Sequence, residues 1–138
     1  MNFEKALAEE LSSLAGIGGR VFPIMAPDTI EDPDGGGDDV PLVTPYILYE
    51  SGYGVEEKAL GGYLDMREIE GEINVVTSTY AGLKQNVAAI IERLKSFERR
   101  AIGSDALFIS EVTYEAPVEL WEPLPKLYRS VIEFKVNI

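Results

Sequence analysis

The side chains of this sequence that could do chemistry are almost all carboxylates. Aspartate and glutamate number 24 and lysine and arginine 12, while cysteine and histidine are both absent. Without cysteine the chain has no thiol nucleophile, no disulfide and no zinc–thiolate site. Without histidine it lacks the side chain best suited to proton transfer near neutral pH and the commonest metal ligand. We therefore expect no catalytic residue, no bound metal and no cofactor, and the acidic clusters are the features to weigh against that expectation.

The densest acidic cluster lies in residues 26–44, which are rich in proline and glycine. The stretch Asp34-Gly-Gly-Gly-Asp38-Asp39 offers oxygen ligands that suit Ca²⁺. Its spacing does not match the EF-hand loop, which places acids at fixed intervals and ends on a glutamate. Six acids and no base make the segment self-repelling, so we predict a long, mobile loop that is solvated or forms an interface. Its interface candidates are Asp28, Asp32, Asp34, Asp38 and Asp39.

A second acidic cluster consists of Glu68, Glu70 and Glu72. Paired carboxylates of this kind can catalyse glycoside hydrolysis when they face each other across a cleft. Spaced two residues apart within a strand pattern, these three side chains instead share one face of a single strand. We therefore predict that they contact solvent or a neighbouring protein, and they are interface candidates.

Two further motifs allow a functional and a structural interpretation. The stretch Gly16-Ile-Gly-Gly19 resembles part of a phosphate-binding loop, but it follows a predicted helix instead of leading into one, so helix termination is the better interpretation. Trp121 is the only tryptophan, and it lies between Leu120 and Leu124. It is either an exposed anchor for a partner protein or a side chain folded back over the sheet, and both interpretations stay open.

The charge of the chain limits its partners. The net charge is −12, and residues 1–62 hold 12 acids and 3 bases (−9) while residues 63–138 hold 12 acids and 9 bases (−3). No basic patch is present to neutralise phosphates, so we expect no specific nucleic-acid binding and no binding to anionic membranes. No run of about 18 apolar residues and no basic, then apolar, leader pattern is found.

Helical periodicity predicts two main helices, over residues 2–15 and 79–97. The first carries an apolar stripe and is ended by the glycines at 16–19, and the second is capped by Ser78 or Thr79. The two stripes consist of Phe3, Leu7, Leu11 and Leu14, and of Leu83, Val87, Ile90, Ile91 and Leu94. We expect both stripes to pack in the core.

Alternating and β-branched segments predict strands at 20–25, 45–53, 64–78, 106–115 and 127–138. Pro23 marks the first as an edge strand, Gly71 suggests a bend in the third, and residues 54–63 and 117–125 are predicted to be irregular. Consecutive strands without crossover helices predict one α+β domain over residues 1–138, with a mostly antiparallel sheet and two main helices packed on one face. The predicted order is α-β-loop-β-β-α-β-β.

The order of short motifs along nearly the whole chain carries a resemblance to a known family. The motifs are an opening helix leading to Gly18-Gly19 and Arg20-Val-Phe-Pro23, then Ala26-Pro27, Pro45-Tyr-Ile-Leu-Tyr49, Asn74-Val-Val-Thr77, Ser78-Thr-Tyr80, Tyr114-Glu and Leu127-Tyr128-Arg129. This order resembles the tail completion or tail terminator proteins of long-tailed bacteriophages and prophages, a group that includes the tail-to-head joining proteins and is similar in plan to the lambda-type minor tail protein U. Two segments depart from the family pattern, because residues 27–45 are longer and more acidic and residues 55–63 look inserted.

The resemblance implies a β-sheet with helices on one side and a hexameric ring. Such a ring caps the tail tube, ends its elongation and provides the surface that joins tail to head. The partners implied are further copies of the chain, the tail tube protein and a head completion or connector protein. The location implied is the virion tail, and the host cytoplasm during assembly. The alternatives are a neighbouring neck or head–tail connector adaptor, a small carboxylate- or metal-dependent hydrolase, and a ligand-binding module.

Overall fold

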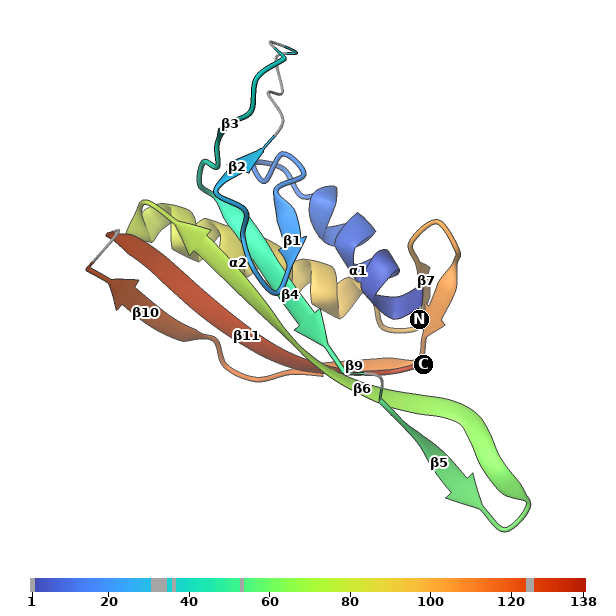
Figure 1. Ribbon diagram of the computed structural model, residues 1–138. Helices are drawn as coiled ribbons and strands as arrows, with labels where there is room; N and C mark the ends of the chain where they lie inside the picture. The colour runs from blue at the N-terminus through green and yellow to red at the C-terminus, as the bar shows by residue number, and fades with distance from the viewer. Residues whose placement is uncertain (1, 31–34, 36, 53, 124–125) are drawn as a thin grey trace.

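The computed structural model describes residues 2–30, 35, 37–52, 54–123 and 126–138, with the backbone alone for residues 2, 55–59 and 63–66 (Figure 1). Its elements are α1 (Asn2–Ser12), β1 (Val21–Pro23), β2 (Thr29–Ile30), β3 (Val40–Pro41), β4 (Tyr46–Ser51), β5 (Val55–Ala59), β6 (Gly62–Thr77), α2 (Tyr80–Ser96), β7 (Arg100–Ile102), β8 (Leu107–Ile109), β9 (Glu111–Tyr114), β10 (Val118–Glu122) and β11 (Leu127–Asn137). Neither helix in this described part of the chain is long and apolar enough to cross a bilayer.

The main sheet has seven strands and is built around the long antiparallel pair of β6 and β11. Its order is β1-β4-β6-β11-β10, with β5 also paired to β6 and β9 also paired to β11. The register of the central pair runs from Tyr128 opposite Thr77 to Asn137 opposite Glu68. Every pairing in this sheet is antiparallel except that of β1 with β4. The predicted α+β class with a mostly antiparallel sheet is confirmed.

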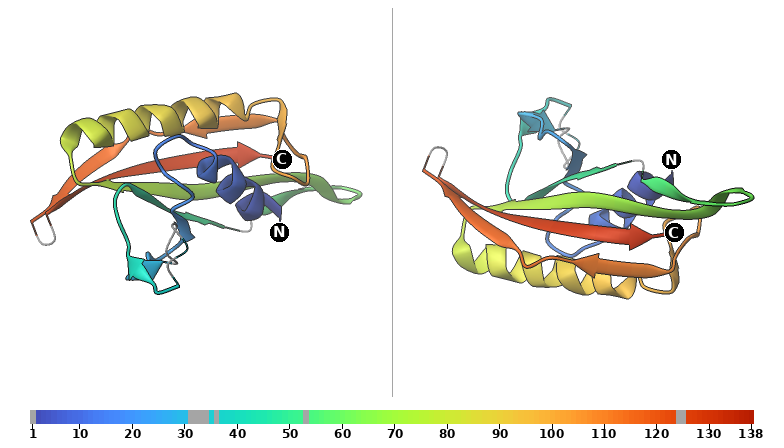
Figure 2. Two further views of the ribbon diagram at one scale, coloured as in Figure 1. Left: turned by 90° about the horizontal axis from the view of Figure 1, so that it is seen from above. Right: turned by 90° about the horizontal axis from the view of Figure 1, so that it is seen from below.

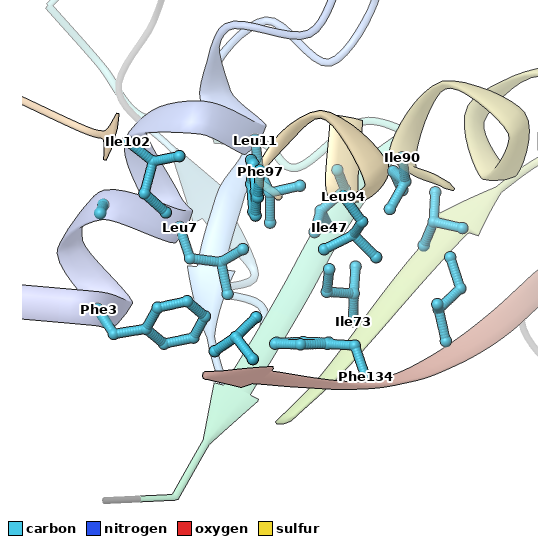
Figure 3. Packing of buried hydrophobic residues seen from close by; sticks show 14 of the residues in the cluster. Phe3, Leu7, Leu11, Ile47, Ile73, Ile90, Leu94, Phe97, Ile102 and Phe134 are labelled. Carbon is cyan, nitrogen blue, oxygen red and sulfur yellow. The ribbon is translucent and has the colours of Figure 1, made fainter. Parts of the chain in front are cut away.

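Both helices pack on one face of this sheet (Figure 2). Phe3, Leu7 and Leu11 of α1 and Ile90 and Leu94 of α2 are fully buried. Their side chains meet the inward-facing residues of the strands, as the close view of the core shows (Figure 3). The strand residues in this contact are Ile47, Ile69, Ile73, Val75, Ile132, Phe134 and Val136. The apolar stripes predicted from sequence therefore form the core.

A polar contact joins the end of α1 to the end of α2. Glu10 accepts hydrogen bonds from Arg93 Nη1 at 3.0 Å and from Arg100 Nη1 at 3.1 Å. Burial disfavours the charged carboxylate, but the hydrogen bonds from Arg100 and Arg93 outweigh that effect, so the pKa of Glu10 lies below its usual value. This contact fixes α1 against α2 at the rim of the core.

The predicted helix over 2–15 is three residues too long, because α1 ends at Ser12. Ser13 N and Leu14 N donate to the carbonyl oxygens of Glu10 and Leu11, three residues back, which tightens the last turn. Gly16, Gly18 and Gly19 follow with positive φ angles, so the glycines end the helix as predicted. At the other helix, Thr79 is the N-cap, and its side chain accepts a hydrogen bond from Gly82 N.

Several predicted loops are strands, so the predicted element order was wrong in these places. Residues 55–59 form β5, which pairs with the first half of β6 in a hairpin that projects from the body (Figure 1). Residues 118–122, between Pro117 and Pro123, form β10 on the free side of β11. Local sequence hides β10, because its flanking prolines are typical of loops, although its partner β11 follows after a short connection. β6 runs through Gly71 as one strand.

The predicted strand over 106–115 is divided into β8 and β9. β8 pairs with β7, a strand not predicted, in a separate two-stranded sheet, whereas β9 pairs with β11. The division falls at Ser110, whose N–H and hydroxyl both donate to Asn137 O, at 2.8 and 2.9 Å. These two bonds hold the chain where it passes from one sheet to the other.

The acidic segment 26–44 is not irregular throughout. Thr29 and Ile30 of β2 pair with Val40 and Pro41 of β3, and Leu42 N donates to Asp28 O at 3.0 Å. This short ladder stands off the body of the molecule (Figure 1). Residues 31–34 and 36 lie outside the described residues, so the predicted mobility of the loop stays a prediction there.

Gly71 allows the central pair to close around an aromatic ring. It lies opposite Phe134, and a Cβ at residue 71 would be 2.5 Å from Phe134 Cζ and 2.8 Å from Glu50 O. We predict that Gly71→Ala lowers the free energy of unfolding by about 1–3 kcal/mol through overpacking. Chemical denaturation followed by circular dichroism measures this change.

The matched control is Gly61→Ala in the turn between β5 and β6, where a Cβ would have no atom within 4 Å. Its free energy of unfolding should change by no more than about 0.5 kcal/mol. Equal losses in the two variants would show that the contact with Phe134 is unimportant.

Candidate assembly surfaces

The helix-free face of the sheet carries a row of four carboxylates from neighbouring strands. Glu50 of β4 lies opposite Glu72 of β6, which in turn lies opposite Glu133 of β11. Glu115, just after β9, donates its N–H to Glu133 O at 2.9 Å and so extends the row. We call Glu50, Glu72, Glu133 and Glu115 the acidic row. Like charges that face each other across strands destabilise a sheet, so this row costs the isolated chain stability.

The predicted cluster of Glu68, Glu70 and Glu72 does share this outward face, but its members have different partners. Lys135 Nζ lies 3.2 Å from Glu70 Oε1 and 4.0 Å from Glu68 Oε1. The hydrogen bond and charge of Glu70 raise the pKa of Lys135. Glu72 accepts a hydrogen bond from Asn74 Nδ2 at 2.8 Å and belongs to the acidic row. The structure therefore places one cation beside two of the three predicted acids.

The acidic row lies in an open groove of about 810 Å³. The charged residues that line the groove are Glu50, Glu70, Glu72, Glu115, Glu133 and Lys135. Sequence reasoning missed Glu50, Glu115 and Glu133 as members of one site. Strand periodicity could place Glu133 on the polar face, but only the register of four strands brings the carboxylates into one row.

Two carboxyl groups of the acidic row interact directly. A hydrogen bond from protonated Glu133 to Glu115 and the charge of Glu115 raise the pKa of Glu133, with further contributions from burial and from the charges of Glu72 and Glu70. Two carboxyl groups can form a hydrogen bond only when one of them is protonated. Glu133 therefore holds its proton at a higher pH than an isolated glutamate would.

Neither acidic surface has the geometry of a catalytic or metal site in the described part of the chain. The acidic row lies on one open sheet face, whereas the two carboxylates of glycoside hydrolysis flank the scissile bond of the substrate. No three acidic side chains among the described residues are placed to hold a metal ion. In the acidic segment, Asp28, Asp38 and Asp39 are exposed, while Asp32 and Asp34 lie outside the described residues.

A third surface is aromatic and lies at the β10 edge of the sheet. The rings of Trp121 and Tyr128 have centroids 4.5 Å apart, and those of Tyr128 and Tyr80 are 5.8 Å apart. Lys84 Nζ lies 5.1 Å from the Tyr80 centroid and also forms an ion pair with Glu119. Trp121 packs on Tyr128 and is still 50% exposed, so it is both folded against the sheet and available to a partner.

Comparison with known proteins shows the fold. No protein-family model matches the chain, and no curated protein matches it. Among solved structures, the chain is similar to a chain of the virion of a native gene transfer agent (GTA) particle, with a TM-score of 0.68 and 14% sequence identity. The similarity covers 98% of this chain and 92% of that chain. This α+β architecture is therefore shared, over nearly its whole length, with a chain of that virion.

The raised pKa of Glu133 predicts how stability depends on pH. A carboxyl group with a raised pKa binds its proton more tightly in the folded than in the unfolded chain. This contribution therefore grows as the pH falls through the folded pKa, and it levels off below the unfolded pKa of about 4.3. We predict that Glu133→Gln raises the melting temperature at neutral pH. We also predict that the melting temperature of this variant increases less than that of the unmodified chain when the pH is lowered from about 7 to about 5.

The matched control is Glu111→Gln, which removes one charge from an exposed position on the same sheet face, opposite Asn137. In thermal melts over the same pH range, the melting temperature of Glu111→Gln should change with pH as steeply as that of the unmodified chain. Equal slopes for the unmodified chain and Glu133→Gln would contradict the raised pKa of Glu133.

Proposed function

We propose that this chain is a structural protein of a phage-type virion, a tail terminator. In this proposal six copies form a ring that caps the tail tube, ends its elongation and provides the surface that joins tail to head. Its partners are further copies of itself, the tail tube protein and a head completion or connector protein. It works in the virion tail, and in the host cytoplasm during assembly.

The observation that carries the proposal is the shared fold. A chain of a gene transfer agent virion has a similar fold, and the similarity covers 98% of this chain. The order of short motifs resembles tail terminators independently of that similarity. The two lines of support come from different properties, backbone arrangement and side-chain identity.

The shape of the molecule also supports assembly. The hairpin of β5 and β6 projects from one end of the sheet, and the short ladder of β2 and β3 stands off the side of the body above β1 and β4 (Figure 1). Leu60, at the tip of the first hairpin, is fully exposed. Two-stranded hairpins are marginally stable alone in water, and an apolar tip adds a further cost. Both costs are removed when the hairpin packs on a neighbouring protein.

The chemistry of the surfaces favours binding over catalysis. The acidic row and its groove lie on an open sheet face, and the aromatic surface lies at a sheet edge. Each of these surfaces is accessible to another protein, and none of them encloses a small substrate. An assembly role needs only that these exposed groups contact another protein, whereas glycoside hydrolysis by two carboxylates would need the second one on the other side of the substrate from the acidic row.

Electron microscopy of tail tubes tests the proposal. The tail tube protein of the phage-type particle that contains this chain is polymerised with and without the purified chain. We predict ring-shaped density at tube ends and shorter tubes when the chain is present. Tubes of unchanged length with bare ends would contradict the proposal, and rings found only on head connectors would favour the neck adaptor instead.

Leu60→Ser tests the projecting hairpin in the same assay. Leu60 has no packing in the isolated chain to lose, so the variant should fold normally. We predict about tenfold weaker capping, because burying a leucine at an interface contributes about 1.5–3 kcal/mol. Leu60→Met keeps the tip apolar and should cap like the unmodified chain. Equal capping by the serine variant would show that this tip has no contact in the assembly.

A further inference from the structure

The outer side of β10 is an open strand edge. β10 pairs with β11 on its inner side, and no strand in the described part of the chain pairs with its outer side (Figure 1). Its apolar side chains, Val118, Leu120 and Trp121, are each about half exposed. The unpaired N–H and C=O groups of such an edge can bind any extended backbone, so native proteins usually protect it.

Alternation along β11 shows which of its residues bond to β10. In an antiparallel pair, a residue directs both its N–H and its C=O to one neighbouring strand, and the next residue directs them to the other side. Glu133 O accepts the N–H of Glu115, on the side of β11 away from β6. Arg129 and Val131 are separated from Glu133 by an even number of positions, so their backbone groups face the same side, where β10 lies.

The same alternation identifies the backbone groups of β10 that face outward. The two β11 residues that face β10 lie opposite Val118 and Leu120, so Val118 and Leu120 use their backbone groups in this pairing. Glu119 and Trp121 therefore direct their N–H and C=O groups away from β11. The outer edge of β10 thus presents two donors and two acceptors, on residues two positions apart.

The usual protection of an edge strand is weak at β10. Both of its acids are in ion pairs, Glu119 with Lys84 and Glu122 with Arg129, so neither presents an unpaired charge to an incoming strand. The prolines that flank β10 lack an N–H, and they limit the open edge to the 5 residues of the strand. The edge is therefore open to a short segment.

β10 presents apolar side chains on both faces of the sheet. Trp121 lies opposite Tyr128, on the face that the helices cover. Val118 and Leu120 point to the helix-free face, where Val131 lies beside them. The side chains of an added strand alternate between the same two faces, so each face of that strand meets apolar surface. The segment that fits consists of about four consecutive apolar residues instead of an alternating pattern.

The surface next to the start of β10 is acidic. Glu115 comes just before Pro117, and its N–H bonds to the carbonyl oxygen of Glu133, which lies opposite Glu72. A segment that follows β10 and continues beyond Pro117 lies beside these carboxylates, where a lysine or arginine is favoured. The segment that fits this edge is therefore a short apolar run with a cation at the end beside Glu115.

The chain itself is a poor source of such a segment. Its runs of three or more apolar residues are at 6–8, 24–26, 46–49, 87–91 and 106–109. Four of these runs lie in or directly beside α1, β4, α2 and β8, which are already packed or paired in the fold. In the run at 24–26, the N–H groups of Ile24 and Met25 already donate to Tyr49 O and Pro23 O. A different protein is therefore indicated as the occupant.

We propose that the outer edge of β10 binds a short extended segment of another protein of the phage-type particle, which adds a strand to the sheet. The backbone groups of Glu119 and Trp121 bind the main chain of the segment, and the apolar side chains on the two faces select its sequence. The inference rests on the proposed function for one point, that the partner is a virion protein.

Hydrogen exchange at single amides tests the inference. In the isolated chain, the amides of Glu119 and Trp121 should exchange about tenfold faster, or more, than that of Leu120, which is bonded to β11. The chain is then mixed separately with the tail tube protein and with the head connector protein, and exchange is read by mass spectrometry with electron-transfer fragmentation. One of these proteins should slow the exchange of Glu119 and Trp121 by about tenfold or more.

Two variants at one position separate the backbone contact from the ion pair. Glu119→Pro replaces the outward N–H with a ring, which an edge strand tolerates, whereas Glu119→Ala keeps the N–H. Both variants lose the ion pair with Lys84. Glu119→Pro should bind the same protein about tenfold more weakly than Glu119→Ala. Thermal melts check that the two variants fold alike, and if they do not, the exchange measurement on the unmodified chain decides.

Equal binding by the two folded variants, or unprotected Glu119 and Trp121 in both mixtures, would overturn the inference. If the chain caps tubes while these two amides stay unprotected, the proposed function stands without the inference. Protection already present in the chain alone, where light scattering shows oligomers, would overturn the inference in favour of a second copy. Protection by the connector protein alone, with tubes that stay bare, would support the inference and contradict the tail terminator.

Discussion

The antiparallel register of β6 and β11 is the constraint on which the rest of the structure depends. The pair runs unbroken from Thr77 and Tyr128 to Glu68 and Asn137, and the other strands of the main sheet attach to it directly or through β4. Strand side chains alternate between faces, so a slip of one residue would exchange the buried and exposed sets. Gly71 fits this register because Phe134 lies across it, where any Cβ would collide with the ring. The apolar core, the acidic row and both sheet edges follow from one pairing.

This register also explains why the surfaces of the molecule suit assembly. Both helices bury one face of the sheet, so the other face and the two edges are left for partners. Carboxylates from three strands and from Glu115, just after β9, are thereby brought into line, and protonation of Glu133 reduces the cost of their repulsion. Strain at Ile24 and exposure of Trp121 are similar costs at the edges. A chain that functions by being buried in a larger particle recovers these costs when it assembles.

Periodicity predicted the parts of the fold that local sequence determines. The stripes of both helices, the face of Glu68, Glu70 and Glu72, and the strands at 45–53, 64–78 and 127–138 were found because each repeats at 3.6 or two residues. β5 and β10 were missed because glycines or prolines flank them, although each pairs with the strand that follows it in the chain. The acidic row was missed because Glu50, Glu115 and Glu133 become neighbours of Glu72 only through the register of the sheet. The interface role of the aspartates in residues 26–44 stays a prediction, with Asp32 and Asp34 outside the described residues.

Cryo-electron microscopy of particles that contain this chain would show whether it forms a ring at the end of a phage-type tail. We predict a single closed ring of copies on the last layer of the tail tube, with the β6–β11 sheet recognisable in each copy. Copies spread along the tube, located inside the head or absent from the finished particle would contradict it.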